Sequence, residues 1–113
     1  MECRHPGCVR RVHTIIGRVE YEWDNREKGK AAKNFRKHGV QLAEALPVFS
    51  DLQAVTIVDS ESDPEEERFV SIGFGAKARL LVVVYAFVTE ERIRVISARL
   101  AEPHEMEEYG EQP

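Results

Sequence analysis

The sequence has few cysteines, a single tryptophan and no long apolar run, and these shortages exclude several classes of protein. Two cysteines in 113 residues are too few to hold a domain of this size together through disulfide bonds. The longest apolar run, Leu80 to Val88, suits a buried strand and falls short of the roughly 20 residues of a membrane-spanning helix. The pair Ile15 and Ile16 is too short for the apolar core of a signal peptide. We therefore expect a cytoplasmic protein.

The common signatures of metal, nucleotide and covalent catalysis are also missing from residues 19–113. This stretch has no cluster of metal ligands, no glycine-rich phosphate loop after a strand, no nucleophile motif and no internal repeat. We therefore predict no cofactor. The N-terminal set of Cys3, His5, Cys8 and His13 leaves a zinc site open, although it lacks the paired-ligand arms of known zinc modules. A small zinc-binding adaptor is thus one alternative function.

The charges of the chain are segregated along the sequence. The net charge of −4 ordinarily argues against a protein that binds nucleic acid. However, residues 26–37 contain six basic side chains and one acid, and residues 68–99 contain six more basic side chains and two acids. The acids gather instead in residues 59–67 and 102–111. Such segregation permits a local basic surface on an acidic protein.

Periodicity predicts one α+β domain over residues 19–113, preceded by an N-terminal extension over residues 1–18 that is a candidate for disorder. Alternating or β-branched runs predict strands at 19–23, 54–58, 68–73, 79–88 and 92–98. Helical spacing predicts a first helix from about 25 to 37, a second that Pro47 shortens or kinks, and a last one from Pro103 with Met106 and Tyr109 on its inner face. Short links between the last strands favour antiparallel pairing. The order of the elements then predicts helices packed on one antiparallel sheet of four to five strands.

The first predicted helix carries a basic face. Asp24 can cap its start, and Gly39 suits the left-handed position after its end. The basic face consists of four residues that follow each other at helical spacing: Arg26, Lys30, Lys33 and Lys37. Ala31, Ala32 and Phe35 fall on the opposite side, where we expect them to meet the core. The basic face can bind a polyanion, or it can be an ordinary solvated helix surface.

One histidine and several cations remain as candidates for chemistry. RNA can be cleaved without a metal when its 2′-hydroxyl attacks the adjacent phosphate, and this reaction needs a general base, a general acid and cations for the pentavalent phosphate. His38, with a pKa expected at about 6.5, could serve in either proton role. The cations that could hold the phosphoryl oxygens are Lys37, Arg68, Arg94 and Arg99.

Each candidate has a structural alternative. His38 before a helix-ending glycine can simply interact with the helix dipole. Arg94 and Arg99 can pair with Glu90, Glu91 or Glu102. Trp23 can stack on a base or, at the start of a helix, anchor the core.

Five short motifs, in order, resemble those of the BrnT toxin family. The first is Tyr21–Asp24 with Asn34–Val40, which resembles EWD followed by N-x-x-KHGV, and the second is Glu66–Phe69 with Ile72–Gly73, which resembles E-R-F-x-x-I-G. The third is Leu80–Tyr85, which resembles an LLVVV-Y strand, and the fourth is Arg92–Arg99, which resembles R-I-R-I-I-S-A-R. The fifth is Glu105 with Tyr109, which resembles a terminal E-x-x-x-Y helix. The resemblance covers about residues 20 to 109.

This resemblance implies a RelE-like ribonuclease toxin of a type II toxin–antitoxin system. Such toxins cleave RNA and stop translation, and a BrnA-type antitoxin neutralises them; the complex contacts DNA only through the antitoxin. At matching positions the resemblance implies catalytic roles for Lys37, His38, Arg68 and Arg99. We expect Arg26, Lys30, Lys33 and Arg94 to bind RNA. The alternative is a non-catalytic toxin-like module that acts through its antitoxin in operon control, which the acidic balance of the chain would suit.

Overall fold

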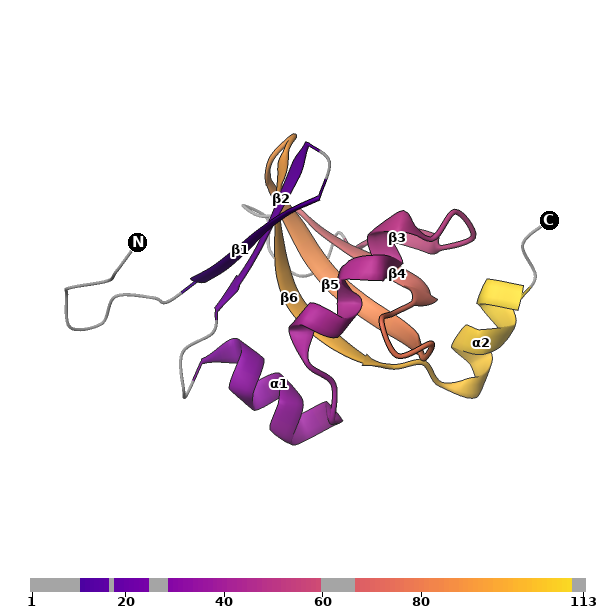
Figure 1. Ribbon diagram of the computed structural model, residues 1–113. Helices are drawn as coiled ribbons and strands as arrows, with labels where there is room; N and C mark the ends of the chain where they lie inside the picture. The colour runs from indigo at the N-terminus through magenta and orange to yellow at the C-terminus, as the bar shows by residue number, and fades with distance from the viewer. Residues whose placement is uncertain (1–10, 17, 25–28, 60–66, 111–113) are drawn as a thin grey trace.

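The chain folds into a twisted sheet with helices against it (Figure 1). The computed structural model describes residues 11–16, 18–24, 29–59 and 67–110. The elements in chain order are β1 (Arg11–Ile16), β2 (Val19–Asp24), α1 (Lys30–His38), the 3-10 helix η1 (Leu42–Ser50), β3 (Val55–Asp59), β4 (Arg68–Phe74), β5 (Leu80–Thr89), β6 (Arg92–Leu100) and α2 (Pro103–Gly110). The α+β class and the order of the predicted elements are therefore confirmed.

The sheet has six strands in the order β1-β2-β6-β5-β4-β3 and is mixed. The prediction of a wholly antiparallel sheet of four to five strands is wrong in two respects. First, β2 pairs with β6 in parallel. A long excursion through three strands and two helices separates these two strands, so no hairpin forces them to be antiparallel. Second, β1 adds an edge strand within the range predicted to be an extension. The short links of β4, β5 and β6 do give antiparallel pairs.

Helix α1 is shorter than predicted. It begins at Lys30 behind Gly29, so Asp24 is not its N-cap residue, and Arg26 lies outside the described residues. Its end is confirmed: Gly39 takes the left-handed conformation with φ 68°, and its N–H donates to the Phe35 carbonyl at 2.8 Å. The last turn therefore delivers His38 just before the chain reverses direction.

Element η1 is a 3-10 helix of nine residues with Pro47 inside it. A proline has no N–H for an α-helical bond, and its ring disturbs the carbonyl four residues earlier. The tighter helix puts every third residue on one side, and Leu42, Ala45 and Val48 are accordingly buried. In Figure 1 this helix lies in front of the sheet, after α1.

The main core lies between η1, α1 and one face of the sheet. Its sheet residues are Tyr21, Trp23, Leu81, Val83, Tyr85, Ile93, Val95 and Ala98. Trp23 is 6 % exposed, so its role as a core anchor is confirmed. A smaller cluster of Ile72, Val82 and Ala101 uses the alternate side chains of the strands and is covered by Tyr109 of α2.

Two predicted core contacts are wrong. Phe35 is 51 % exposed, and the buried residue of α1 is Asn34. The inner stripe of α1 runs through Ala31, Asn34 and His38, because the Asn34 amide finds hydrogen-bond partners there. Met106 is 50 % exposed, whereas Tyr109 packs edge-on against Phe74 and donates to Asp51 at 2.8 Å.

Gly75, in the turn between β4 and β5, permits a close backbone approach to η1. A Cβ at this position would lie 2.6 Å from the Glu44 carbonyl oxygen and 2.5 Å from Leu81 Cδ1. We expect Gly75→Ala to lower the free energy of unfolding by about 1–3 kcal/mol through this clash. Gly110→Ala is the control, because nothing lies within 4 Å of its Cβ position. Urea denaturation measures both, and equal midpoints would contradict the prediction.

Candidate functional site

The C-terminal end of α1 presents a cluster of cations with one titratable imidazole. Its last turn consists of Arg36, Lys37 and His38, and His38 is half-buried. Partial burial lowers the pKa of His38 below its ordinary value, and the positive charges of Lys37 and then Arg99 lower it further. The imidazole is therefore neutral at pH 7 and can accept a proton. Strand β6 adds Arg99 to this end of α1, because the Asn34 side chain of α1 bonds to Ala98, the residue before Arg99.

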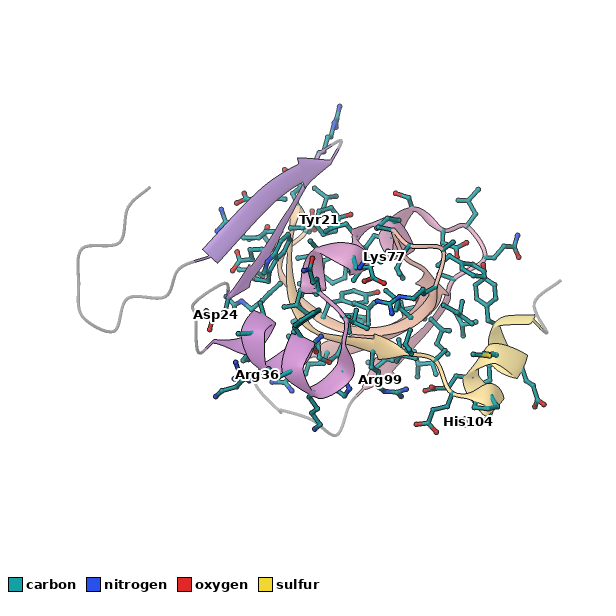
Figure 2. The ribbon with its side chains drawn as sticks, turned by 60° about the horizontal axis from the view of Figure 1, so that its bottom comes forward. Tyr21, Asp24, Arg36, Lys77, Arg99 and His104 are labelled. Carbon is teal, nitrogen blue, oxygen red and sulfur yellow. The ribbon has the colours of Figure 1, made fainter. Side chains whose placement is uncertain are left out.

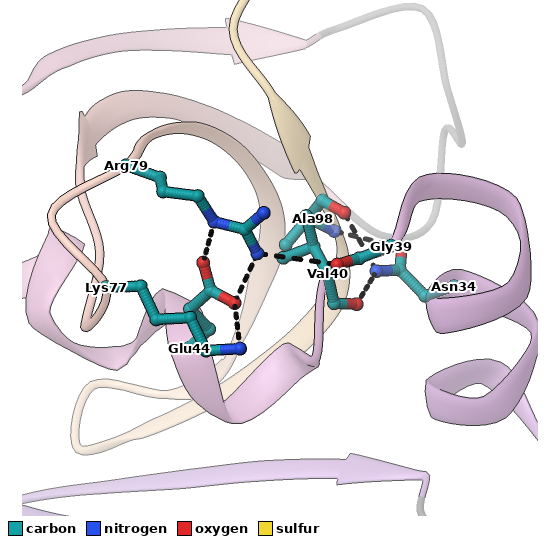
Figure 3. A network of polar contacts seen from close by, with 7 residues as sticks. All are labelled: Asn34, Gly39, Val40, Glu44, Lys77, Arg79 and Ala98. Atoms are coloured by element: carbon teal, nitrogen blue, oxygen red, sulfur yellow. Dashed lines mark hydrogen bonds and ion pairs between the residues drawn. The ribbon is translucent and has the colours of Figure 1, made fainter.

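The amide of Asn34 joins α1 to β6 at this point (Figure 3). Its Nδ2 donates to the carbonyls of Val40 and Ala98, both at 2.8 Å, and its Oδ1 accepts from the Ala98 N–H at 3.1 Å. The side chain is 6 % exposed, so these bonds satisfy an otherwise costly buried amide. Ala98 immediately precedes Arg99, and Asn34 lies one helical turn before His38. The sequence pattern by itself predicts no separate role for Asn34.

Arg99 is held by a carboxylate of the C-terminal helix. Its Nη1 and Nη2 donate to the two oxygens of Glu105 at 2.8 and 2.7 Å, and Glu105 is 8 % exposed. Nη1 also donates to the Leu100 carbonyl at 3.2 Å. In Figure 2, Arg99 lies between the end of α1 and α2. Among the described residues, no partner takes its Nε–H or the second Nη2–H, which point along one edge of the guanidinium. That edge can bind two oxygens of a phosphate.

These contacts shift the acid–base behaviour of both partners. The hydrogen bonds from Arg99 lower the pKa of Glu105, and those to Glu105 raise the pKa of Arg99. Both groups therefore remain charged in the neutral pH range. The predicted ion pair of Arg99 with Glu102 also forms, with Glu102 Oε1 3.8 Å from Nη1 of Arg99.

The cations of α1 differ from those of the strands in their pairing. Lys30, Lys33, Arg36 and Lys37 are exposed and form no ion pair with any residue that the structure describes. By contrast, the strand-borne arginines Arg92, Arg94 and Arg99 and the turn arginine Arg79 all have carboxylate partners. Three members of the basic face, Lys30, Lys33 and Lys37, are thus available to an anion from outside.

Two predicted site residues lie away from His38. Arg94 faces the buried Glu22, with its Nε 3.3 Å from Oε2, and so serves first to neutralise that carboxylate. Arg68 is in register with Ala86 on β5, whereas Arg99 is in register with Val82. Four residues of an extended strand separate these rows by about 13 Å. The structure therefore brings together Lys37, His38 and Arg99 but not Arg68.

Arg68 nevertheless has an unusual environment. Its Nε is buried and has no hydrogen-bond partner among the residues described. A buried donor of this kind is costly unless something accepts its bond. Arg68 is therefore a candidate contact for an anion on the sheet, separate from the cluster around His38.

The predicted N-terminal zinc ligands cannot be placed from the part of the chain that the structure describes. In the described ranges, no three His, Cys, Asp or Glu side chains come together as a metal site. Cys3, His5 and Cys8 lie outside those ranges, as does the side chain of His13. No helix in the same ranges is long and apolar enough to cross a membrane.

Comparison with known proteins identifies the family. Residues 23–105 match the family described as the ribonuclease toxin BrnT of type II toxin–antitoxin systems. The fold is similar to the crystal structure of the Brucella abortus ribonuclease toxin BrnT, with a TM-score of 0.54 and 28 % sequence identity over 71 % of this chain and 92 % of that chain. No curated protein sequence matches. The chain therefore belongs to the BrnT family of ribonuclease toxins of type II toxin–antitoxin systems.

Proposed function

We propose that this chain is an endoribonuclease that cleaves RNA without a metal and thereby inhibits translation. The observation that carries the proposal is the cluster of Lys37, His38 and Arg99 at the end of a helix whose cations have no ion-pair partner among the described residues. Family membership supplies the substrate class, and the cluster supplies the residue types that the reaction needs.

In this proposal the neutral imidazole of His38 removes the proton from the 2′-hydroxyl, which then attacks the adjacent phosphorus. The free edge of Arg99 holds the phosphoryl oxygens, on which negative charge grows in the transition state. Lys37 adds a second positive charge beside them. Arg68, on a different row of the sheet, contacts a phosphate farther along the RNA. Lys30 and Lys33 guide the RNA backbone to the end of α1.

The chemistry is tested by the products and by a chelator. Purified protein should cleave bulk RNA at the same rate in excess EDTA and leave 2′,3′-cyclic or 3′-phosphate ends. The P–O5′ bond breaks as the P–O2′ bond forms, and the 5′-oxygen leaves with a proton from water. The product is a 2′,3′-cyclic phosphate, which a water molecule can then open to a 3′-phosphate. Loss of all cleavage in EDTA, or products with 5′-phosphate ends, would contradict the mechanism.

The cellular role separates this proposal from that of a non-catalytic module. Induction of the chain without its neighbouring gene should arrest growth and reduce incorporation of labelled amino acids within minutes. A binding module that acts only in operon control would leave both unchanged.

We further propose a BrnA-type antitoxin as the partner, with DNA contacted only through that partner. The exposed cations of α1 suit an acidic, amphipathic segment, because charge complementarity favours a partner that neutralises them. Co-expression with the adjacent gene should yield a stable complex without nuclease activity. A complex that cleaves RNA as fast as the free chain would contradict this role.

The basic face makes a separate prediction about RNA affinity. We expect Lys30→Gln with Lys33→Gln to weaken binding of a non-cleavable RNA. The slope of log affinity against log salt should also become shallower, by about 0.7 for each phosphate that the protein no longer neutralises. The reason is that each neutralised phosphate releases a counterion. Sequence preference should hardly change, because interactions with the RNA backbone carry no base information.

Lys77→Gln is the matched control, since Lys77 is an exposed lysine on the turn between β4 and β5 that is not part of the basic face. Fluorescence anisotropy over a salt series measures all three proteins. An unchanged slope in the double variant would mean that the face is only a solvated helix surface.

A further inference from the structure

Asn34 links the two sides of the candidate site through its side-chain amide. Its three hydrogen bonds go to backbone atoms, one to the segment that leaves α1 and two to β6. The two bonds to Ala98 bridge residues 64 positions apart in sequence. The Asn34 side chain bonds to both the N–H and the carbonyl of Ala98, and these are the two bonds that a neighbouring strand would otherwise make with that residue.

The Asn34 side chain makes these bonds in the part of β6 that no longer pairs with β2. The parallel pairing of β2 extends only as far as Glu22 opposite Arg94. Beyond that point α1 packs beside β6, and the Asn34 amide supplies the bonds that a strand would otherwise make. The distance between α1 and β6 is therefore set by the length of one short side chain.

We propose that Asn34 is a positioning residue: its carboxamide fixes the separation between His38 and Arg99. The inference rests on the proposed function only for its effect on cleavage. Asn34 itself faces backbone on both sides and is almost fully buried, so it does not reach the RNA. Its contribution acts through His38, one turn later on α1, and through Arg99, the residue after Ala98.

A second feature agrees with this role. On the other side Arg99 is held by both oxygens of Glu105. The guanidinium thus cannot follow His38 if α1 shifts, because a buried carboxylate keeps it in place. A change at Asn34 should therefore move the imidazole relative to a fixed cation.

The test is the titration of His38, followed by NMR in the full chain. In Asn34→Ala the pKa of His38 should rise toward its ordinary value, because the imidazole moves away from the charge of Arg99 and becomes more hydrated. Lys37, its other charged neighbour, lies on the same helix and moves with it. Asn34→Gln keeps the amide but lengthens it by one methylene, and it should raise the pKa in the same direction while most hydrogen bonds persist.

Ala32→Gly is the control, because glycine weakens α1 while the Asn34 hydrogen bonds to β6 are retained, and it should leave the pKa of His38 unchanged. RNA cleavage by the Asn34 variants should fall about 10- to 100-fold in kcat with little change in KM. An unchanged His38 pKa in both Asn34 variants would overturn the proposal. Loss of the fold in both would also overturn it, since the amide would then hold the domain together. If the pKa rises but even the parent cleaves no RNA, positioning stands and the proposed function fails.

Discussion

Replacing Arg99 and Glu105 together by glutamine is expected to reduce RNA cleavage by more than about 100-fold, which corresponds to about 3 kcal/mol less transition-state stabilisation. The double variant removes the guanidinium edge that we propose binds phosphate. It also avoids the defect that a single change would create, because Arg99→Gln alone leaves the buried Glu105 carboxylate without its partner. Two neutral amides can still bond to each other and keep α2 in place. Initial rates on a defined RNA measure the effect.

The chain contains a closely matched control for this experiment. Arg79 and Glu44 form the same kind of pair, with an Nη2–Oε1 distance of 2.7 Å, and the Arg79 side chain is 33 % exposed against 34 % for Arg99. Arg79→Gln with Glu44→Gln also removes a long bond of 3.4 Å from Arg79 to the Gly39 carbonyl, next to His38. This double variant should lower the melting temperature to a similar extent, but cleavage should fall far less than in the Arg99 double variant. Equal loss of cleavage in both double variants would show that the Arg99 pair serves only the fold.

His38→Gln is expected to lower kcat/KM by about 100-fold or more, the usual contribution of a positioned general base. The side chain keeps its polarity but can no longer take a proton at neutral pH. The pH profile supplies the sharper evidence. A base must be unprotonated, so the activity of the parent should fall as pH drops through the pKa of His38. That inflection should lie below the ordinary histidine value of about 6.5, because burial, Lys37 and Arg99 lower the pKa.

Removing one of these causes should move the inflection. In Lys37→Gln the pKa of His38 should rise, and the acid limb of the profile should shift to higher pH, while His38→Gln should abolish that limb. Profiles of kcat/KM across the acidic and neutral range test both statements. An acid limb that persists in His38→Gln would assign it to a different group.

The parts of the fold that depend on local pattern could be predicted from the sequence. The apolar and β-branched runs that form β4, β5 and β6 are long, and their links are too short for anything but antiparallel pairs. Gly39 specifies the end of α1 because its positive φ is tolerated best without a side chain.

The parts that depend on distant contacts could not be predicted. No local pattern indicates that β2 lies beside β6, because five other elements separate these two strands in sequence. Hydrophobicity places Phe35 on the inner stripe of α1. Asn34 lies there instead, because its buried amide donates hydrogen bonds to the carbonyls of Val40 and Ala98. The spacing of apolar residues gives no sign of these carbonyls. The signal that could have found it is the one-turn spacing of Asn34 from His38.

The candidate site likewise contains features that local sequence predicts and features that depend on distant contacts. Lys37 and His38 are neighbours in sequence, and their juxtaposition requires no fold. The approach of Arg99 to α1 requires the packing of α1 on β6. Its two hydrogen bonds to Glu105 require the turn into α2. Arg68 resembles the other arginines in sequence, and only the strand register places it on a separate row.

The long sequence separation between Asn34 and Ala98 also governs when the site can exist during synthesis. The helix that carries His38 leaves the ribosome before β6 and α2 do. Contacts between such distant segments close slowly and cannot form before both are present. A nascent chain, or one truncated before residue 92, therefore holds the imidazole and the lysines but neither the guanidinium nor the carboxylate that fixes it. On the proposed mechanism, we therefore expect cleavage competence to arise only after α2 has been made.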